Sequence, residues 1–433
     1  MKHTKSLLVA ALAVLSVGAA SADTIYITGS TAFRKAANAS IGSYVDGKSA
    51  GSGIIFSDTT GANPVGATDI AWQYVTGGST NYIVAHWSGS EGGIQNTAAP
   101  AGTKTYNYVN LATATLQSPA SFATGVGIAG ATNSGNVIAT NGNIVMADTT
   151  QASSLFKNTY AGTTYTGLNG SQVGVVTFAW VVNSGANSGV TNMTSQNARA
   201  ILTGGFVSAA MLTGSSSDTN DVLWLIGRDI DSGTRLTTLG ETGFGTTKAV
   251  KQYFIGYGGT TTNNVYLTPA TSINGVTEVK GNAGYTSGSG SSASGLMYQI
   301  KNYGILASGT ALTVDTNSTA NTYTGGNYLI GYAGTGDCGK VSASPVRLLS
   351  YNGVPYSDGA VYNGQYTFWG YENLYYNAST VTANTVTVAT ALISTLQGLP
   401  TGNGVGTLQN AGVPLSSMVV ARGSDFAVVT QNY

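Results

Sequence analysis

The stretch "LIGRDIDSGTRLTTLGETG" at residues 225–243 gathers charged side chains around a Ser-Gly-Thr triplet. Only 8% of the 433 residues are charged, so such a cluster is unusual in this chain. Its members beside the triplet are Arg228, Asp229, Asp231 and Arg235. The apolar run at 222–226 predicts a strand, and "DSGTRLTTLGE" predicts the start of a helix. The unit is therefore a strand followed by a polar turn and a helix.

The same kind of unit recurs along the chain. Apolar runs predict strands at 24–28, 143–148, 173–183, 222–226 and 328–332. A helix is expected within 29–41, capped by Ser30 or Thr31, and another through Leu202, capped by Thr194 or Ser195 and stopped by glycines. Repeated strand–turn–helix units predict an α/β fold with mixed, mostly parallel sheets.

Three regions depart from this pattern, at about 45–85, 95–142 and 258–326. They are rich in Gly, Thr, Asn and Ser. We expect β-rich insertions there, as decorated loops or short hairpins on the scaffold. The segment "SGSGSSASG" at 287–295 fits either a flexible linker or another helix entry.

The first 22 residues have the pattern of a secretory signal peptide. Lys2 and Lys5 precede an apolar stretch, and the small residues at 20–22 predict cleavage before Asp23. A short membrane anchor is the alternative, but no later run approaches the length of a membrane span. The sequence therefore predicts a periplasmic or secreted protein without stable membrane insertion.

The charge, cysteine and histidine content of the chain excludes several classes of function. Loss of Lys2 and Lys5 leaves two fewer basic than acidic residues, and no basic cluster indicates a nucleic-acid partner. Cys338 is the one cysteine, which excludes an internal disulfide and predicts a small buried side chain. His86 is the one histidine of the mature chain, so no His-based triad with a metal site can be assembled. We therefore expect that the protein is not an enzyme and that it uses no cofactor.

The Ser-Gly-Thr turn has the chemistry of an anion site. A helix N-terminus presents unpaired backbone N–H groups and a partial positive charge. Gly233 allows close approach, Ser232 and Thr234 add hydroxyl donors, and Arg228 or Arg235 adds a planar fork of donors. The alternative is a plain capped helix whose arginines pair with the neighbouring aspartates on the surface.

Two other turns offer similar donors. "TGSTAF" at 28–33 places Ser30 and Thr31 directly after a strand, and "WSGSEGGIQN" at 87–96 places Ser90 before a short helix. In an open α/β sheet such turns meet at the carboxyl ends of the strands, where ligands bind. The sequence therefore predicts that the three turns converge.

Several ordered motifs resemble the phosphate-binding proteins of phosphate ABC transporters. "GRDIDSGTR" resembles the R-x-x-x-S-G-T motif of that family, and "ITGSTAF", "GSEGGI" and "MADTT" resemble its other site segments. "YLIGYAGTG" resembles its late "IGY" strand, and "YNGQYTFWGYENLYY" resembles its Y-P-hydrophobic stretch before the C-terminal helices. The matches run in order from about 24 to 376. The resemblance implies a two-lobed type II periplasmic-binding-protein fold, a phosphate or related oxyanion ligand, and a membrane ABC permease as partner.

Carried over by position, the resemblance implies the ligand-binding residues Ser30, Thr31, Phe33, Ser90, Asp148, Arg228, Ser232, Gly233 and Thr234. Phe33 would contribute its amide, and Asp148 would accept the proton of hydrogen phosphate and repel sulfate. Glu91 departs from the small residue of the family and should face outwards or cap its helix. The aromatic residues Tyr366, Phe368, Trp369 and Tyr371 should pack the first lobe rather than touch the ligand.

The expected division is lobe I at 23–180 and 335–433 and lobe II at 181–334, with hinge crossings at "FAWVVN" and "LIGYAG". A different function also fits the composition. Low charge with abundant Gly, Thr, Asn and Tyr is compatible with a secreted structural or surface protein that reuses the binding-protein scaffold.

Overall fold

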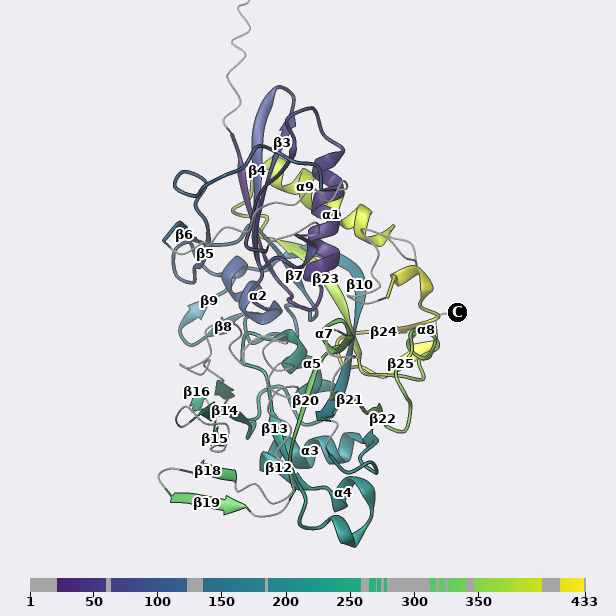
Figure 1. Cartoon of the computed structure of the whole chain (residues 1–433). Coiled ribbons are helices and arrows are strands. Elements are labelled where there is room, and N and C mark those ends of the chain that lie inside the picture. The colour runs from purple at the N-terminus through teal and green to yellow at the C-terminus, as the bar shows by residue number, and fades with distance from the viewer. Residues whose placement is uncertain are drawn as a thin grey trace, which may run out of the picture.

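A computed structural model describes residues 22–59, 64–122, 135–183, 186–257, 326–339, 346–398 and 413–431, with five strands between 265 and 323. The chain forms two α/β lobes, one above the other in Figure 1. A mixed sheet runs through both lobes in the order β19-β18-β15-β14-β13-β20-β10-β23-β7-β1-β4-β3-β2. The predicted two-lobed α/β fold class is confirmed.

Lobe I is built on a central parallel trio of strands with antiparallel strands at its sides. The trio is β4 (Ser79–His86), β1 (Thr24–Gly29) and β7 (Ile144–Ala147), flanked by β3 (Asp69–Thr76), β2 (Gly53–Ser57) and β23 (Trp369–Tyr376). All four residues of β7 are buried, as expected of a strand covered on both faces.

Helices cover both faces of this sheet. Ile144 and Met146 belong to the core that includes residues of α1 (Arg34–Asp46) and α9 (Ala383–Gln397). Val145 and Ala147 point the other way, into a cluster with Ile94 of α2 (Ser90–Ala98). Figure 1 shows α1 and α9 side by side, with α2 apart from them.

Lobe II has a second parallel centre. Strand β13 (Val222–Ile226) pairs in parallel with β20 (Asn327–Gly334) and β14 (Tyr253–Tyr257), and antiparallel with β12 (Phe206–Ser208). Helix α3 (Ser195–Gly204) packs on β12 and β13, and α5 (Gly233–Glu241) follows β13 and packs on β20.

The remaining elements are short. The strands are β5 (Tyr106–Val109), β6 (Val137–Thr140), β8 (Thr159–Tyr160), β9 (Thr163–Thr164), β11 (Asn192–Met193), β15 (Val265–Pro269), β16 (Thr271–Ile273), β17 (Val276–Glu278), β18 (Leu312–Thr316), β19 (Thr319–Tyr323), β21 (Val346–Leu348), β22 (Ser350–Tyr351), β24 (Val420–Arg422) and β25 (Val429–Gln431). The helices are α4 (Ala210–Thr213), α7 (Thr335–Gly339) and α8 (Asp358–Tyr362).

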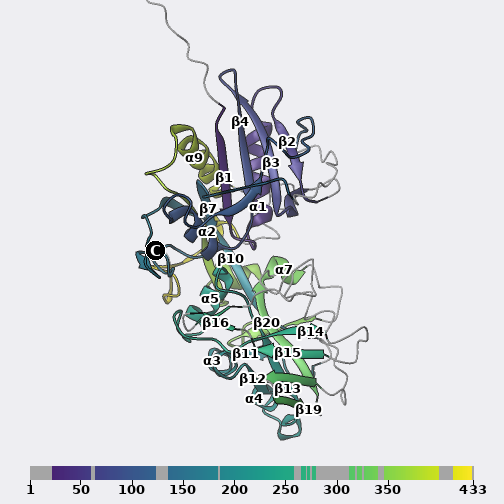
Figure 2. The ribbon, with the colours of Figure 1, turned by 90° about the vertical axis from the view of Figure 1, so that its left-hand side faces the viewer.

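One long strand joins the lobes. The first part of β10 (Asn169–Asn183) pairs with β23 of lobe I, and residues 178–182 pair with β20 of lobe II. Both views show β10 running between the two lobes (Figures 1 and 2). The two segments "FAWVVN" and "YLIGYAG" therefore lie side by side as an antiparallel pair.

Several local predictions are confirmed. The five expected strands correspond to β1, β7, β10, β13 and β20. Thr194 caps α3 by accepting from the Asn197 N–H at 3.0 Å, and Gly205 ends the helix in the left-handed conformation, with φ of 81°. Cys338 is buried, and His86 Nδ1 lies 2.8 Å from Asp69 Oδ1.

Other local predictions are wrong. The first helix begins at Arg34, because residues 31–33 form a turn after β1. The region 45–85 is not decoration, since it contains β2, β3 and most of β4, which belong to the main sheet. Parallel pairing is confined mainly to the two lobe centres, because hairpins and the strands that join the lobes add antiparallel pairs.

Some predictions fall outside the described residues. They concern residues 1–21 of the expected signal peptide, the segment 287–295 and most of 258–326. Among the helices that the structure describes, none is both long and apolar enough to cross a membrane.

Candidate functional site

The turns after β1 and β4 lie against each other. The Gly89 N–H donates to Gly29 O at 2.8 Å, and the hydroxyls of Thr28 and Ser88 are 3.0 Å apart. Gly29 has φ of 124°, and a Cβ there would stand 1.9 Å from Met146 O, so only glycine fits this crossing. Two of the three predicted turns are therefore neighbours.

Ser30 anchors the first turn. Its N–H donates to Met146 O at 2.7 Å, and its Oγ accepts from the Phe33 N–H at 3.2 Å. The Phe33 N–H, which was expected to be a ligand donor, is bonded to Ser30 here, and the Phe33 side chain is buried in the core. Thr31 is half-buried in the same turn.

Ser90 and Asp148 meet at the end of β7. Ser90 opens α2, and its Oγ accepts from the Asp148 N–H at 3.1 Å. Both residues are buried. The Asp148 carboxyl group thus lies beside the N-terminus of α2 and the turn of Ser30.

The start of α5 completes the arrangement from lobe II. Ser232 caps α5, because its Oγ accepts a hydrogen bond from the Arg235 backbone N–H at 3.2 Å. Thr234 Oγ1 donates to Asp148 Oδ2 at 3.5 Å. A Cβ on Gly233 would stand 1.6 Å from Asp148 Oδ1 and 2.7 Å from Ser90 Cβ, so a larger residue cannot occupy this position. The N-terminus of α5 therefore packs directly on the Ser90–Asp148 pair.

A further backbone contact fixes the two lobes here. The Gly92 N–H of α2 donates to Asp231 O at 3.1 Å. Since Gly92 belongs to lobe I and Asp231 to the turn before α5, the predicted convergence of the turns is present across the lobes.

Both arginines of the Ser-Gly-Thr turn are buried, each only 2% exposed. Arg235 Nη1 donates to Arg228 O at 2.9 Å, and Gln252 Nε2 donates to the same oxygen at 3.0 Å. The two arginines therefore do not lie on the surface, as the alternative of a plain capped helix had them.

Asp148 has an unusual electrostatic environment. Burial raises its pKa to about 6, while the Ser90 hydroxyl and the Arg228 charge act in the opposite direction. Within the described part of the chain, Asp148 Oδ1 has no hydrogen-bond partner although it is fully enclosed. Because buried polar atoms are nearly always hydrogen-bonded, this unpaired oxygen calls for a functional explanation.

The sequence predicted that Glu91 faces outwards or caps its helix, and both alternatives are wrong. Its carboxyl oxygens accept from Thr149 Oγ1 and Ser154 Oγ, each at 2.7 Å. Burial raises the pKa of Glu91 to about 7, while the two hydroxyls lower it. The bonds to Thr149 and Ser154 hold this carboxyl group within lobe I.

Sequence reasoning did not identify Glu372 and Asp425. Glu372 is fully buried, and the charge of Asp148 raises its pKa. It is the sole charged residue in the aromatic stretch 362–376, which is a signal that the sequence contains. Asp425 Oδ2 accepts from the N–H and hydroxyl of Thr150 at 2.6 and 2.7 Å, and nothing in the sequence indicates that pairing.

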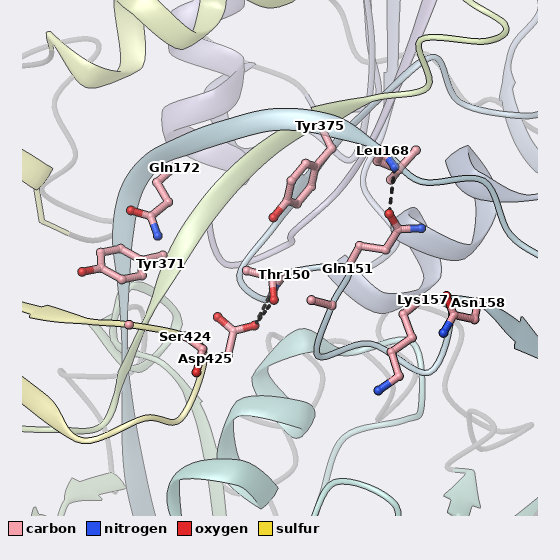
Figure 3. A pocket seen from close by; sticks show the side chains of 12 residues that line it. Thr150, Gln151, Lys157, Asn158, Leu168, Gln172, Tyr371, Tyr375, Ser424 and Asp425 are labelled. Atoms are coloured by element: carbon pink, nitrogen blue, oxygen red, sulfur yellow. Dashed lines mark hydrogen bonds between the residues drawn. The ribbon is translucent and has the colours of Figure 1, made fainter.

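An open pocket of about 650 Å³ borders this region. Figure 3 shows Lys157, Tyr371 and Tyr375 around it, with the Thr150–Asp425 bonds on one wall. None of the nine predicted site residues lines this pocket, because the side chains at the meeting of the turns are enclosed. The aromatic residues Tyr366, Phe368, Trp369 and Tyr371 are buried in the core.

The described residues contain no group of three His, Cys, Asp or Glu side chains placed to hold a metal ion. The chemistry of the site is therefore that of N–H and O–H donors, two buried arginines and carboxyl groups.

Comparison with solved structures finds phosphate-binding proteins of low identity. A Clostridium perfringens protein assigned as a phosphate ABC transporter substrate-binding protein, solved with bound phosphate, is 12% identical, with a TM-score of 0.42 over 85% of this chain and 92% of its own. An ABC-type phosphate transport receptor from Vibrio cholerae is 13% identical, with a TM-score of 0.39 over 85% and 93%. PstS from Borrelia burgdorferi is 12% identical, with a TM-score of 0.36 over 86% and 92%. No family model and no curated protein matches the chain.

Proposed function

We propose that the protein binds phosphate or a related small oxyanion between its two lobes, where three helix-start turns meet. The contacts of Asp148 support this proposal most directly, because they join Ser90 of lobe I to Gly233 and Thr234 of lobe II. The proposed ligand-binding residues are Ser30, Thr31, Phe33, Ser90, Asp148, Arg228, Ser232, Gly233 and Thr234.

The donors and charges suit a small oxyanion. The first turns of α1, α2 and α5 supply partial positive charge, and buried Arg228 adds a full one. Asp148 in its ionised form can only accept, so it selects an oxyanion that still carries a proton. The protein has no catalytic role in this proposal.

We assign lobe I to 23–180 and 335–433 and lobe II to 181–334, with opening and closing about the β10–β20 pair. The paired segments 178–182 and 330–334 lie where such a hinge is needed. An exported protein that delivers its ligand to a membrane ABC permease follows from the motif resemblance.

Isothermal titration calorimetry with inorganic phosphate tests the proposal. We expect micromolar or tighter binding that is lost in Arg228→Ala, because the buried guanidinium is removed from the anion. Arg199→Ala is the matched control, since Arg199 lies on α3 and bonds Thr242 O and Gln196. Absence of phosphate binding together with self-assembly would favour the structural or surface role.

A further inference from the structure

Strand register places a second carboxyl group beside Asp148. In the antiparallel pairing of β23 with β7, Asn373 lies opposite Ala147 and Leu374 opposite Met146. The same register, continued by one residue, sets Glu372 opposite Asp148. Side chains that lie opposite each other in an antiparallel pair point to the same face, with Cβ atoms about 4.5–5.5 Å apart. Glu372 and Asp148, the residue that follows β7, are therefore neighbours, and the Asp148 charge acts on Glu372.

The Glu372 side chain is enclosed from every side. It is 0% exposed, and neither of its oxygens makes a regular hydrogen bond to any residue that the structure describes. On the other neighbouring strand it faces Gly174, whose missing side chain leaves room for the Phe33 ring. An ionised carboxylate without hydrogen bonds would carry a large desolvation cost in such a place.

The groups around Glu372 also oppose its ionisation. Burial raises its pKa well above the ordinary value, the charge of Asp148 raises it further, and the Ser30 hydroxyl lowers it. On β10, the residue opposite Glu372 is Gly174, which carries no charge. Helix α9 packs on β23 and has no ionisable side chain. The strand of Glu372 itself also carries Tyr371, Tyr375 and Tyr376, and the charge of Glu372 would act on Tyr375. Arg228 and Asp425 act on Asp148.

This inference rests on the function proposed above. We propose that Glu372 is a further residue of the anion site. The Glu372 side chain remains a neutral acid beside the bound oxyanion, while Asp148 is ionised. Its O–H group supplies a donor next to Ser30, where an ionised carboxylate would repel the ligand. Because only one of the two adjacent carboxyl groups is ionised, the repulsion of two buried charges is avoided. The pair thus presents one donor and one acceptor, which matches a singly protonated tetrahedral oxyanion such as hydrogen phosphate.

Infrared spectroscopy of the phosphate-loaded protein tests this assignment directly. At about pH 8, which is above the values of about 6 and about 7 for Asp148 and Glu91, we expect a carbonyl band from a protonated carboxylic acid. The band should vanish in Glu372→Gln and persist in Asp148→Asn. Asp46→Asn is the remote control, because the Asp46 carboxylate bonds Ser121 and the Phe122 N–H. We expect it to leave the band unchanged.

Calorimetry with phosphate gives an independent measurement. Glu372→Leu removes the proposed O–H donor, so its affinity for phosphate should fall about tenfold or more, and unchanged affinity would overturn the inference. A gain of about tenfold or more would show that the wild-type residue is ionised, and it would overturn the inference. If Glu372→Gln does not fold, persistence of the band in Asp148→Asn still supports the assignment, and its loss there contradicts it.

Failure of this inference can be told apart from failure of the proposed function. A wild type that does not bind phosphate overturns both. A wild type that binds phosphate but has no protonated-acid band at about pH 8 overturns the role of Glu372 alone.

Discussion

Arg422 and Glu241 form a buried ion pair, 2.8 Å between Nη1 and Oε2, that joins the C-terminal segment 413–431 to helix α5. The Arg422 guanidinium also donates to Thr367 O and lies 4.6 Å from the centre of the Trp369 ring. Three residues further on, Asp425 bonds Thr150 of lobe I. The segment therefore ties the helix that carries the Ser-Gly-Thr turn to lobe I.

Replacement of Arg422 by alanine should destabilise the protein strongly. It leaves Glu241 buried without its cation, and breaking a buried pair in this way costs about 3–5 kcal/mol. Urea unfolding would measure the change in the free energy of unfolding. Arg199→Ala, on half-buried α3, should lower the free energy of unfolding much less. Equal losses of unfolding free energy in the two variants would contradict the proposed importance of the ion pair.

Gly233→Ala should abolish phosphate binding. The new Cβ would stand 1.6 Å from Asp148 Oδ1, so Asp148 or the start of α5 has to move. We expect a loss of affinity of about 100-fold or more, because a misplaced donor set no longer fits the ligand. Titration calorimetry measures it. Gly204→Ala, where an added Cβ meets nothing within 4 Å, is the matched control, and equal affinity in both variants would exclude the proposed site.

The preference for phosphate over sulfate should depend on pH through Asp148. Above its pKa of about 6 the ionised carboxylate accepts a proton from hydrogen phosphate and repels sulfate. Below about 6 the neutral acid can donate to either anion, so the affinity ratio should fall as the pH is lowered. Asp148→Asn should show the reduced ratio throughout. Competition titrations at several pH values measure the ratio, and a constant ratio would count against this role of Asp148.

Glu91 should make the ligand-free protein less stable as the pH rises. Its pKa is raised from 4.5 to about 7, so between these values the folded state binds the proton more tightly than the unfolded state. Stability from this group is complete below about 4.5 and is lost towards about 7. Glu91→Gln should remove this dependence and gain up to about 3 kcal/mol at about pH 8.

Urea midpoints at about pH 5 and about pH 8 would test the prediction for Glu91. The variant should show a shallower decline than the wild type. Parallel declines in the two proteins would mean that Glu91 does not hold a proton in the folded state.

The parts of the fold that are local in sequence could be predicted. Val222–Ile226 is an uninterrupted apolar run, and Ser232 has the cap chemistry of a helix start, so β13 and α5 follow from neighbouring residues. The place of the hairpin β2–β3 in the main sheet could not, because the Gly- and Thr-rich region 45–85 shows weak alternation and the hairpin joins the sheet through pairing with β4.

The candidate site, like the fold, could be predicted from the sequence only in part. Three turns with Ser or Thr beside Gly could be recognised from sequence, and the structure brings Ser30, Ser90 and Thr234 to one region. The partners of Asp148 across the sheet could not be recognised, since Glu372 reaches it only through the register of β23. The buried position of Glu91 depends on Thr149 and Ser154, which meet it only after folding.

The position of β23 between β7 and β10 has a consequence for how the chain folds. Residues 369–376 are synthesised more than 180 residues after β10, yet both neighbours need that strand to complete their backbone pairing. Until it arrives, β7 and β10 present open edges that favour aggregation. Pairings between such distant segments also form slowly. The sheet of lobe I is therefore expected to be completed only after residues 369–376 have been synthesised.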